Sequence, residues 1–165
     1  MQQKKYLRCS RFAVIDGRIP AVFGISRSML RCAAGYFAWR SMLRVHSGEW
    51  SPVSVVLVDD ARSSEAHKAV MGIDGATDVI TEVFNPMPGE TGAAAGELIV
   101  NTDCALRAAP RRKSWSPLKE LLLYIAHGMD HLSGADDYTL ADRMRMRRRE
   151  LSWIAAFQSV SGFSI

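Results

Sequence analysis

One stretch organises this chain: His127-Gly128-Met129-Asp130-His131-Leu132-Ser133-Gly134-Ala135-Asp136-Asp137. His127 and His131 are four residues apart, so on a helix they project from one face, close enough to share a metal ion. The preceding segment is typical of such a helix, because Ser116 suits the N-cap, Pro117 suits the first helical position and strong helix formers follow. We therefore expect both histidines in the last turns of one helix.

Gly134 lies where a glycine can end that helix in a left-handed conformation and fold the chain back. Asp137 is well placed to return to the two histidines. The pattern His-x3-His-x2-Gly-x2-Asp supplies two imidazoles and one carboxylate and leaves a coordination position for water, as a catalytic zinc site requires. Two histidines alone would more often be core or surface residues. With the glycine and the aspartate, we predict one zinc ion per chain bound by His127, His131 and Asp137; another divalent transition metal would suit the same donors.

These residues resemble the signature of the YbeY endoribonucleases, also called ribosomal RNA maturation factors, which is close to His-Gly-x-Leu-His-Leu-x-Gly-Tyr-Asp-His. The residues that match it in place are His127, Gly128, His131, Leu132, Gly134 and Asp136. Farther along, Asp142, Met146 and Glu150 are similar to spaced acidic, Met and Glu positions of the family. Segments 53–60, 77–80 and 96–100 resemble family segments in the same order, so the likeness covers roughly residues 50–155.

The resemblance implies a metal-dependent endoribonuclease that cleaves single-stranded RNA in ribosomal RNA maturation and ribosome quality control. It assigns no catalytic group beyond the metal-bound water. Two positions depart from the family pattern. Asp137 stands where the family has its third metal-binding histidine, a change that zinc tolerates and that lowers the charge of the site by one unit. Met71, after Val70, stands where the family has an arginine after a tyrosine, and methionine cannot hold a phosphate through forked hydrogen bonds.

Two other functions remain open from the residues. A non-catalytic RNA-binding or ribosome-associated member of the family would keep the scaffold without turnover, and Met71 favours this alternative. A metallopeptidase is less favoured, because such sites place a glutamate directly after the first histidine and this chain has Gly128 there. Asp130 is a weak substitute as a general base, and we expect it to be a solvated helix residue.

Composition predicts one globular domain over residues 1–165, since 48% of the residues are hydrophobic and 23% are charged. The net charge of +4 permits a polyanionic partner without requiring one. Cys9, Cys32 and Cys104 are scattered, which favours reduced thiols and a cytoplasmic protein. The longest apolar run, 121–126, is too short to cross a bilayer, so we expect no membrane partner.

Basic residues form two clusters on either side of the histidine stretch. The first precedes the predicted metal helix beside Trp115, and the second lies on the last helix. A solvated polar face is one explanation, and tracking of an RNA backbone is the other. The candidates for RNA contact are Arg107, Arg111, Arg112, Lys113, Arg143 and Arg147, among neighbours that include Arg145, Arg148 and Arg149.

The predicted fold is α+β, with a small mixed sheet of about four strands, about five helices and the metal helix lining a cleft. Strands are expected near 12–15, 54–58, 77–84 and 97–101, and helices over 26–42, 63–71, 103–109, 116–131 and the last segment. Residues 85–90 and 92–96 are predicted as loop. On the last helix, Met146, Glu150, Trp153 and Phe157 share a stripe, with Glu150 expected to bridge buried polar groups. Glu120 and Tyr124 are further candidates to support the histidines.

Overall fold

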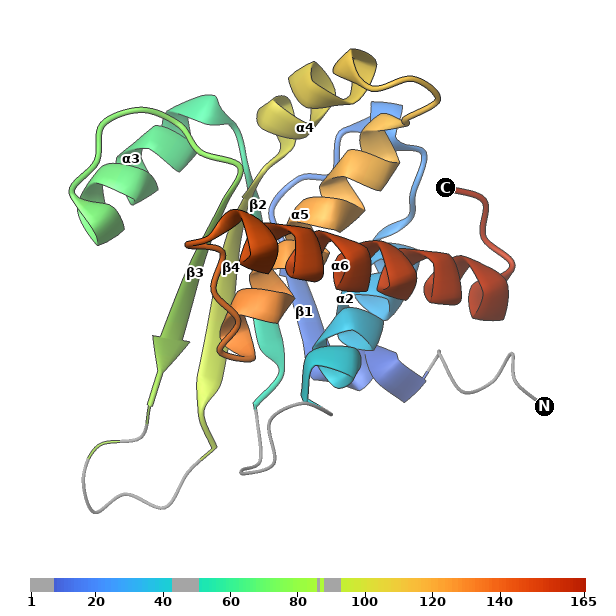
Figure 1. The fold of residues 1–165 in the computed structure, drawn as a ribbon, viewed down its shortest axis with the longest axis horizontal. Coiled ribbons are helices and arrows are strands. Elements are labelled where there is room, and N and C mark those ends of the chain that lie inside the picture. Colours follow the sequence, from blue (N-terminus) through green and yellow to red (C-terminus); the bar gives the residue numbers. More distant parts are fainter. Residues whose placement is uncertain (1–7, 43–50, 86, 88–92) are drawn as a thin grey trace.

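A mixed four-stranded sheet forms the base of the fold (Figure 1). The computed structural model describes residues 8–42, 51–85, 87 and 93–165. The strands are β1 (Ala13–Asp16), β2 (Val53–Val58), β3 (Val79–Phe84) and β4 (Ala95–Asn101). Their order is β1-β2-β4-β3, in which β1, β2 and β4 run parallel and β3 pairs antiparallel with β4. The buried residues of β2 and β4 form the centre of this sheet.

In the described residues five α-helices accompany the sheet: α2 (Arg27–Met42), α3 (Asp60–Met71), α4 (Thr102–Ala108), α5 (Pro117–Leu132) and α6 (Leu140–Ser161). Short 3-10 turns precede or follow them as η1 (Arg8–Phe12), η2 (Ala21–Phe23) and η3 (Ala109–Arg111). Helices α2 and α5 pack on the sheet and on each other, and α6 crosses α5 on the side away from the sheet (Figure 1). This layering places α5 in the middle of the molecule. None of the helices in the described residues is both long and apolar enough for a bilayer span.

Helix α5 is strongly amphipathic and is nevertheless buried on almost its whole circumference, since Glu120 and Asp130 on its polar side are buried together with its apolar residues. It approaches the sheet closely through glycines. A Cβ atom at Gly128 would lie 2.7 Å from the side chain of Leu98 on β4, and one at Gly96 would lie 2.8 Å from the side chain of Leu132. From the other side α6 contributes the predicted stripe of buried residues, Met146, Glu150, Trp153 and Phe157.

The predicted α+β class, the four strands and the five helices are confirmed. Helix α3 begins three residues earlier than predicted, because Asp59 caps it by accepting a hydrogen bond from the Arg62 backbone N–H at 2.9 Å. Strand β3 begins only at Val79, since the Asp78 side chain accepts the Val79 backbone N–H. The loop predicted over 92–96 is wrong at its end, where residues 95 and 96 already belong to β4. Of the loops predicted over 85–90 and 92–96, residues 86, 88–90 and 92 lie outside the described part.

The contact between α2 and η1 provides a test of this packing. Gly35 faces η1 so closely that a Cβ atom would lie 2.0 Å from the carbonyl oxygen of Cys9 and 3.2 Å from Cα of Ser10. Gly35→Ala should gain about 1 kcal/mol of helix propensity. The overlap with backbone atoms outweighs that gain, and we expect a net loss of about 1–3 kcal/mol in the free energy of unfolding. Chemical denaturation measures it, and an unchanged or raised stability would contradict this packing.

Candidate metal centre

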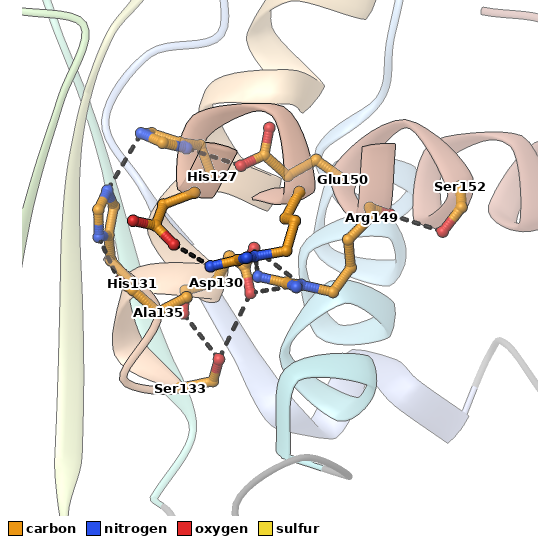
Figure 2. A network of polar contacts seen from close by, with 10 residues as sticks. His127, Asp130, His131, Ser133, Ala135, Arg149, Glu150 and Ser152 are labelled. Atoms are coloured by element: carbon orange, nitrogen blue, oxygen red, sulfur yellow. Dashed lines mark hydrogen bonds and ion pairs between the residues drawn. The ribbon is translucent and has the colours of Figure 1, made fainter. Parts of the chain in front are cut away.

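The two histidines of α5 direct their Nε2 atoms at one another. These atoms are 3.1 Å apart, and the ring planes make an angle of 77°. Each Nδ1 atom has its own partner: that of His127 lies 2.7 Å from Oε1 of Glu150, and that of His131 lies 2.9 Å from the carbonyl oxygen of Ala135. Figure 2 shows these contacts between the end of α5, the loop after it and α6.

The partners of the two rings determine where their protons lie. A carboxylate and a carbonyl only accept hydrogen bonds, so in the neutral rings both Nδ1 atoms carry the proton. Both Nε2 lone pairs then face the same point from 3.1 Å apart, an arrangement that is unfavourable unless a proton on one ring or a metal ion lies between them. Imidazoles oriented through Nδ1–H in this way are typical of metal ligands. The donor set therefore fits a divalent metal ion.

The loop after α5 brings a carboxylate to the histidines. Gly134 adopts φ +82°, in the left-handed region, as predicted from its position. Its backbone N–H donates to the carbonyl of His131, and the Ala135 N–H donates to the carbonyl of Asp130. Asp137 then returns to the two rings, and the ligand atoms of His127, His131 and Asp137 all lie within 4.8 Å of one another. The structure thus brings together the three predicted ligands.

Glu150 is the group that controls His127. Its side chain is 1% exposed, so the carboxylate has little water around it and the hydrogen bond to the ring is strong. Burial alone lowers the pKa of His127, but the hydrogen bond to Glu150 and the charges of Glu150, Asp78 and Asp137 outweigh burial and raise it. Negative charge around the ring that raises its affinity for a proton also favours a metal cation. Glu150 was expected to bridge buried polar groups; the contact shown is with one partly buried group, His127.

Asp130 is not the solvated helix residue that the sequence suggested. It is fully buried and accepts hydrogen bonds on both carboxylate oxygens from Nε of Arg149, at 2.9 and 3.0 Å. The Nη2 atom of Arg149 donates to the same carboxylate, and the Ser133 hydroxyl donates to the Asp130 carbonyl (Figure 2). Arg149 and Glu150 are consecutive on α6. They contact Asp130 and His127, which are three residues apart on α5. The sequence contains these four polar residues, but no local pattern indicates which residue of α6 contacts which residue of α5.

Glu120 and Tyr124 do not support the histidines, and that prediction is wrong. The buried carboxylate of Glu120 pairs with Arg112 at 3.3 Å, and the hydroxyl of Tyr124 lies 3.6 Å from Sγ of Cys104. The contact of Glu120 lies toward the N-terminal end of α5, and that of Tyr124 lies at its middle. Glu120 is seven residues from His127, about 10 Å along the helix axis, so its side chain meets a different neighbour.

The first basic cluster also lies at that end of α5. Arg107 forms a salt bridge with Asp60 and lowers the pKa of that carboxyl group, and Arg112 pairs with Glu120 and lies over the ring of Trp115. The remaining members, Arg111 and Lys113, are exposed. The start of α5 is about 15 Å along the axis from His127. Contact of this cluster with RNA stays a prediction.

The family model described as Endoribonuclease YbeY matches residues 36–158. The chain belongs to the YbeY family. The resemblance predicted from the stretch around His127 and His131 is therefore confirmed. Two relatives, each named endoribonuclease YbeY, illustrate the range of similarity. The protein of Anaeromyxobacter sp. strain Fw109-5 is 37% identical over 98 residues, which cover 59% of this chain and 50% of the relative. The protein of Micrococcus luteus is 34% identical over 124 residues, covering 72% and 75%.

This chain thus matches half the length of the first relative and three quarters of the second. Among solved structures, the solution structure of TM1509 from Thermotoga maritima superposes with a TM-score of 0.55 over 89% of each chain. Its sequence is 19% identical, so it supports the fold alone. Within this YbeY-family fold, α5 and the loop after it carry the three candidate ligands.

The contact between Glu150 and His127 predicts how metal affinity responds to mutation. Glu150→Ala should weaken zinc binding by about tenfold to a hundredfold, because the imidazole loses the acceptor that holds its orientation. Glu150→Gln keeps an acceptor oxygen without the charge and should lose less. Competition with a chromophoric zinc chelator measures both, with Glu65→Ala, an exposed carboxylate of α3, as the control. Equal affinity for wild type and Glu150→Ala would contradict this role.

The ion pair between Asp130 and Arg149 predicts a stability effect that depends on the partner. Arg149→Met leaves a buried carboxylate without its cation and should lower the free energy of unfolding by about 3 kcal/mol. The double variant Asp130→Leu/Arg149→Met removes the charge as well and should be more stable than Arg149→Met. Denaturant titration of both variants measures this difference. A double variant less stable than the single one would show that the carboxylate has a more important partner.

Proposed function

We propose that this YbeY-family chain is a metal-dependent endoribonuclease that cleaves single-stranded RNA, acting as a single domain over residues 1–165. The observation that carries the proposal is the convergence of His127, His131 and Asp137, with both Nε2 atoms turned to one point. Family membership supplies the substrate, because the matching family model and the relatives carry the name endoribonuclease. We further propose ribosomal RNA as that substrate and the ribosome as its setting.

Zinc is the metal we propose, at one ion per chain. Two imidazole nitrogens and one carboxylate oxygen suit zinc in a catalytic site with an open position. A zinc ion bound there would polarise a scissile phosphate and lower the pKa of a bound water. The protein residues then have separate tasks: Glu150 orients His127, and the Ala135 carbonyl orients His131. We also propose a cytoplasmic location, where the free thiols of this chain stay reduced.

A non-catalytic RNA-binding protein is the alternative, and it depends on Met71 alone. Met71 ends α3 with 60% of its surface exposed and offers no cation to a phosphate. The metallopeptidase alternative loses support, because the position after the first histidine faces the sheet. There Gly128 contacts Leu98 and Val79 so closely that a longer side chain would not reach the metal site without moving them.

Elemental analysis of the purified protein tests the metal site first. We expect about one zinc per chain in the wild type, loss of zinc in Asp137→Ala, and retention in Asp137→His, because imidazole is an equivalent donor. Glu65→Ala serves again as the matched carboxylate control. Zinc retained in Asp137→Ala would remove Asp137 from the ligand set, and a wild type free of any transition metal would contradict the site.

RNA cleavage tests the activity. The wild type should cleave a single-stranded ribosomal RNA fragment, lose that activity on chelation and regain it with zinc. His131→Ala should abolish cleavage, because it removes a metal ligand and the alanine side chain has no atom that could bind the metal in its place. A metal-loaded wild type that binds the RNA but leaves it intact would instead support the non-catalytic alternative.

A further inference from the structure

Large apolar side chains are exposed next to the candidate metal centre, where α6 begins. Tyr138 is 82% exposed, and Leu140 and Met144 are 69% and 53% exposed. Tyr138 directly follows the candidate ligand Asp137, so their Cα atoms are about 3.8 Å apart. Exposed apolar groups gathered at one place indicate a binding surface more often than scattered ones do. This patch therefore adjoins the point where a substrate has to approach the metal.

Four of the five arginines of α6 fall into two rows with different surroundings, and the fifth, Arg148, is exposed and belongs to neither row. Arg145 pairs with Asp142, and Arg149 pairs with Asp130, so one flank of the helix is neutralised. Arg143 and Arg147 are exposed and have no acidic partner among the described residues.

The row with unneutralised charge is the one that adjoins the metal centre. Arg143, Arg147 and Glu150 follow one another at intervals of four and three residues, so they lie along one side of α6. Glu150 in turn contacts His127. Leu140 and Met144 share this flank, since residues 140, 143, 144 and 147 have the spacing of one helix face. Tyr138 and this flank of α6, here called the strip, lie in the chain between the candidate ligand Asp137 and Glu150, which contacts His127.

We propose that Tyr138 is a base-stacking residue for single-stranded RNA, with Arg143 and Arg147 binding phosphates along the same strip. This inference rests on the proposed function, since it identifies part of the substrate path to the same site. Exposed aromatic rings and cations together bind single strands without sequence preference, and Tyr138 is exposed and near Arg143 and Arg147 in the chain. A duplex keeps its bases stacked inside and offers no face to Tyr138. The strip therefore selects for an unpaired nucleotide next to the scissile phosphate.

Fluorescence anisotropy with a labelled single-stranded RNA, in the presence of a chelator to prevent cleavage, tests the stacking. Tyr138→Ala should weaken binding at least about fivefold, because stacking on an aromatic ring contributes that much or more for each base. Tyr138→Phe keeps the ring and should bind like the wild type. Val22→Ala, an exposed apolar residue on η2, is the control and should also bind like the wild type. The duplex of the same sequence should not distinguish the variants.

The roles of Arg143 and Arg147 are tested separately, by measuring how the affinity for the single-stranded RNA depends on salt concentration. Arg143→Gln and Arg147→Gln should each reduce the slope of log affinity against log salt by about 0.7, the value for one phosphate contact on a single strand. Arg145→Gln, on the neutralised flank, should leave the slope unchanged. An unchanged slope for both Arg143→Gln and Arg147→Gln would show that neither arginine binds an RNA phosphate.

Several outcomes would overturn the role of Tyr138. They are binding unchanged in Tyr138→Ala, an equal loss in Tyr138→Phe, and a wild type that binds no single-stranded RNA. Self-association of the wild type that disappears in Tyr138→Ala, with RNA binding intact, would assign the patch to a protein partner instead. The proposed function fails separately, if the metal-loaded wild type cleaves no RNA while Tyr138→Ala still weakens binding.

Discussion

The burial of α5 between the sheet and α6 is the constraint on which the rest of the structure depends. The wide apolar face of this helix has to be covered, and the sheet, α2 and α6 cover it so fully that polar side chains of the helix are buried as well. Its few polar side chains then lie in surroundings where an unpaired charge costs several kcal/mol. Asp130 and His127 have hydrogen-bonded partners in Arg149 and Glu150, whereas Glu120 has an ion pair with Arg112 at 3.3 Å and no hydrogen bond to its Oε2 atom. The candidate metal centre is the part of this buried polar network that opens toward the surface.

Local chemistry explains why much of this arrangement could be predicted from the sequence. The cap at Ser116, the spacing of the two histidines and the left-handed turn at Gly134 depend only on residues near one another in the chain. These features determine where α5 begins, which way its histidines project and how Asp137 returns. The structure agrees with all of them.

Ion pairs between residues of different helices could not be predicted from local sequence patterns. Asp130 looked like a solvated helix residue, because a single carboxylate in a helix is usually exposed. Its partner, Arg149, is nineteen residues away and belonged to a run of arginines that gave no reason to distinguish one from another. Glu120 was misjudged for the same reason, since its helix face was predicted correctly but its neighbour, Arg112, lies before the helix. Tertiary packing selects among charges that are equivalent in the sequence.

Some of the arginines form ion pairs and others do not. Under the proposed function, this difference bears on how an RNA strand would reach the metal centre. At the start of α5, Arg107 and Arg112 are held in ion pairs, and that cluster is about 15 Å along the helix from His127. On α6, the charges of Arg143 and Arg147 are not neutralised, and their row ends at Glu150. With Asp137 in place of an imidazole, the net charge of the metal centre is one unit lower, and Met71 at the end of α3 supplies no cation. Attraction for a phosphate then has to come from cations beside the site, and the strip on α6 is where the described structure provides them.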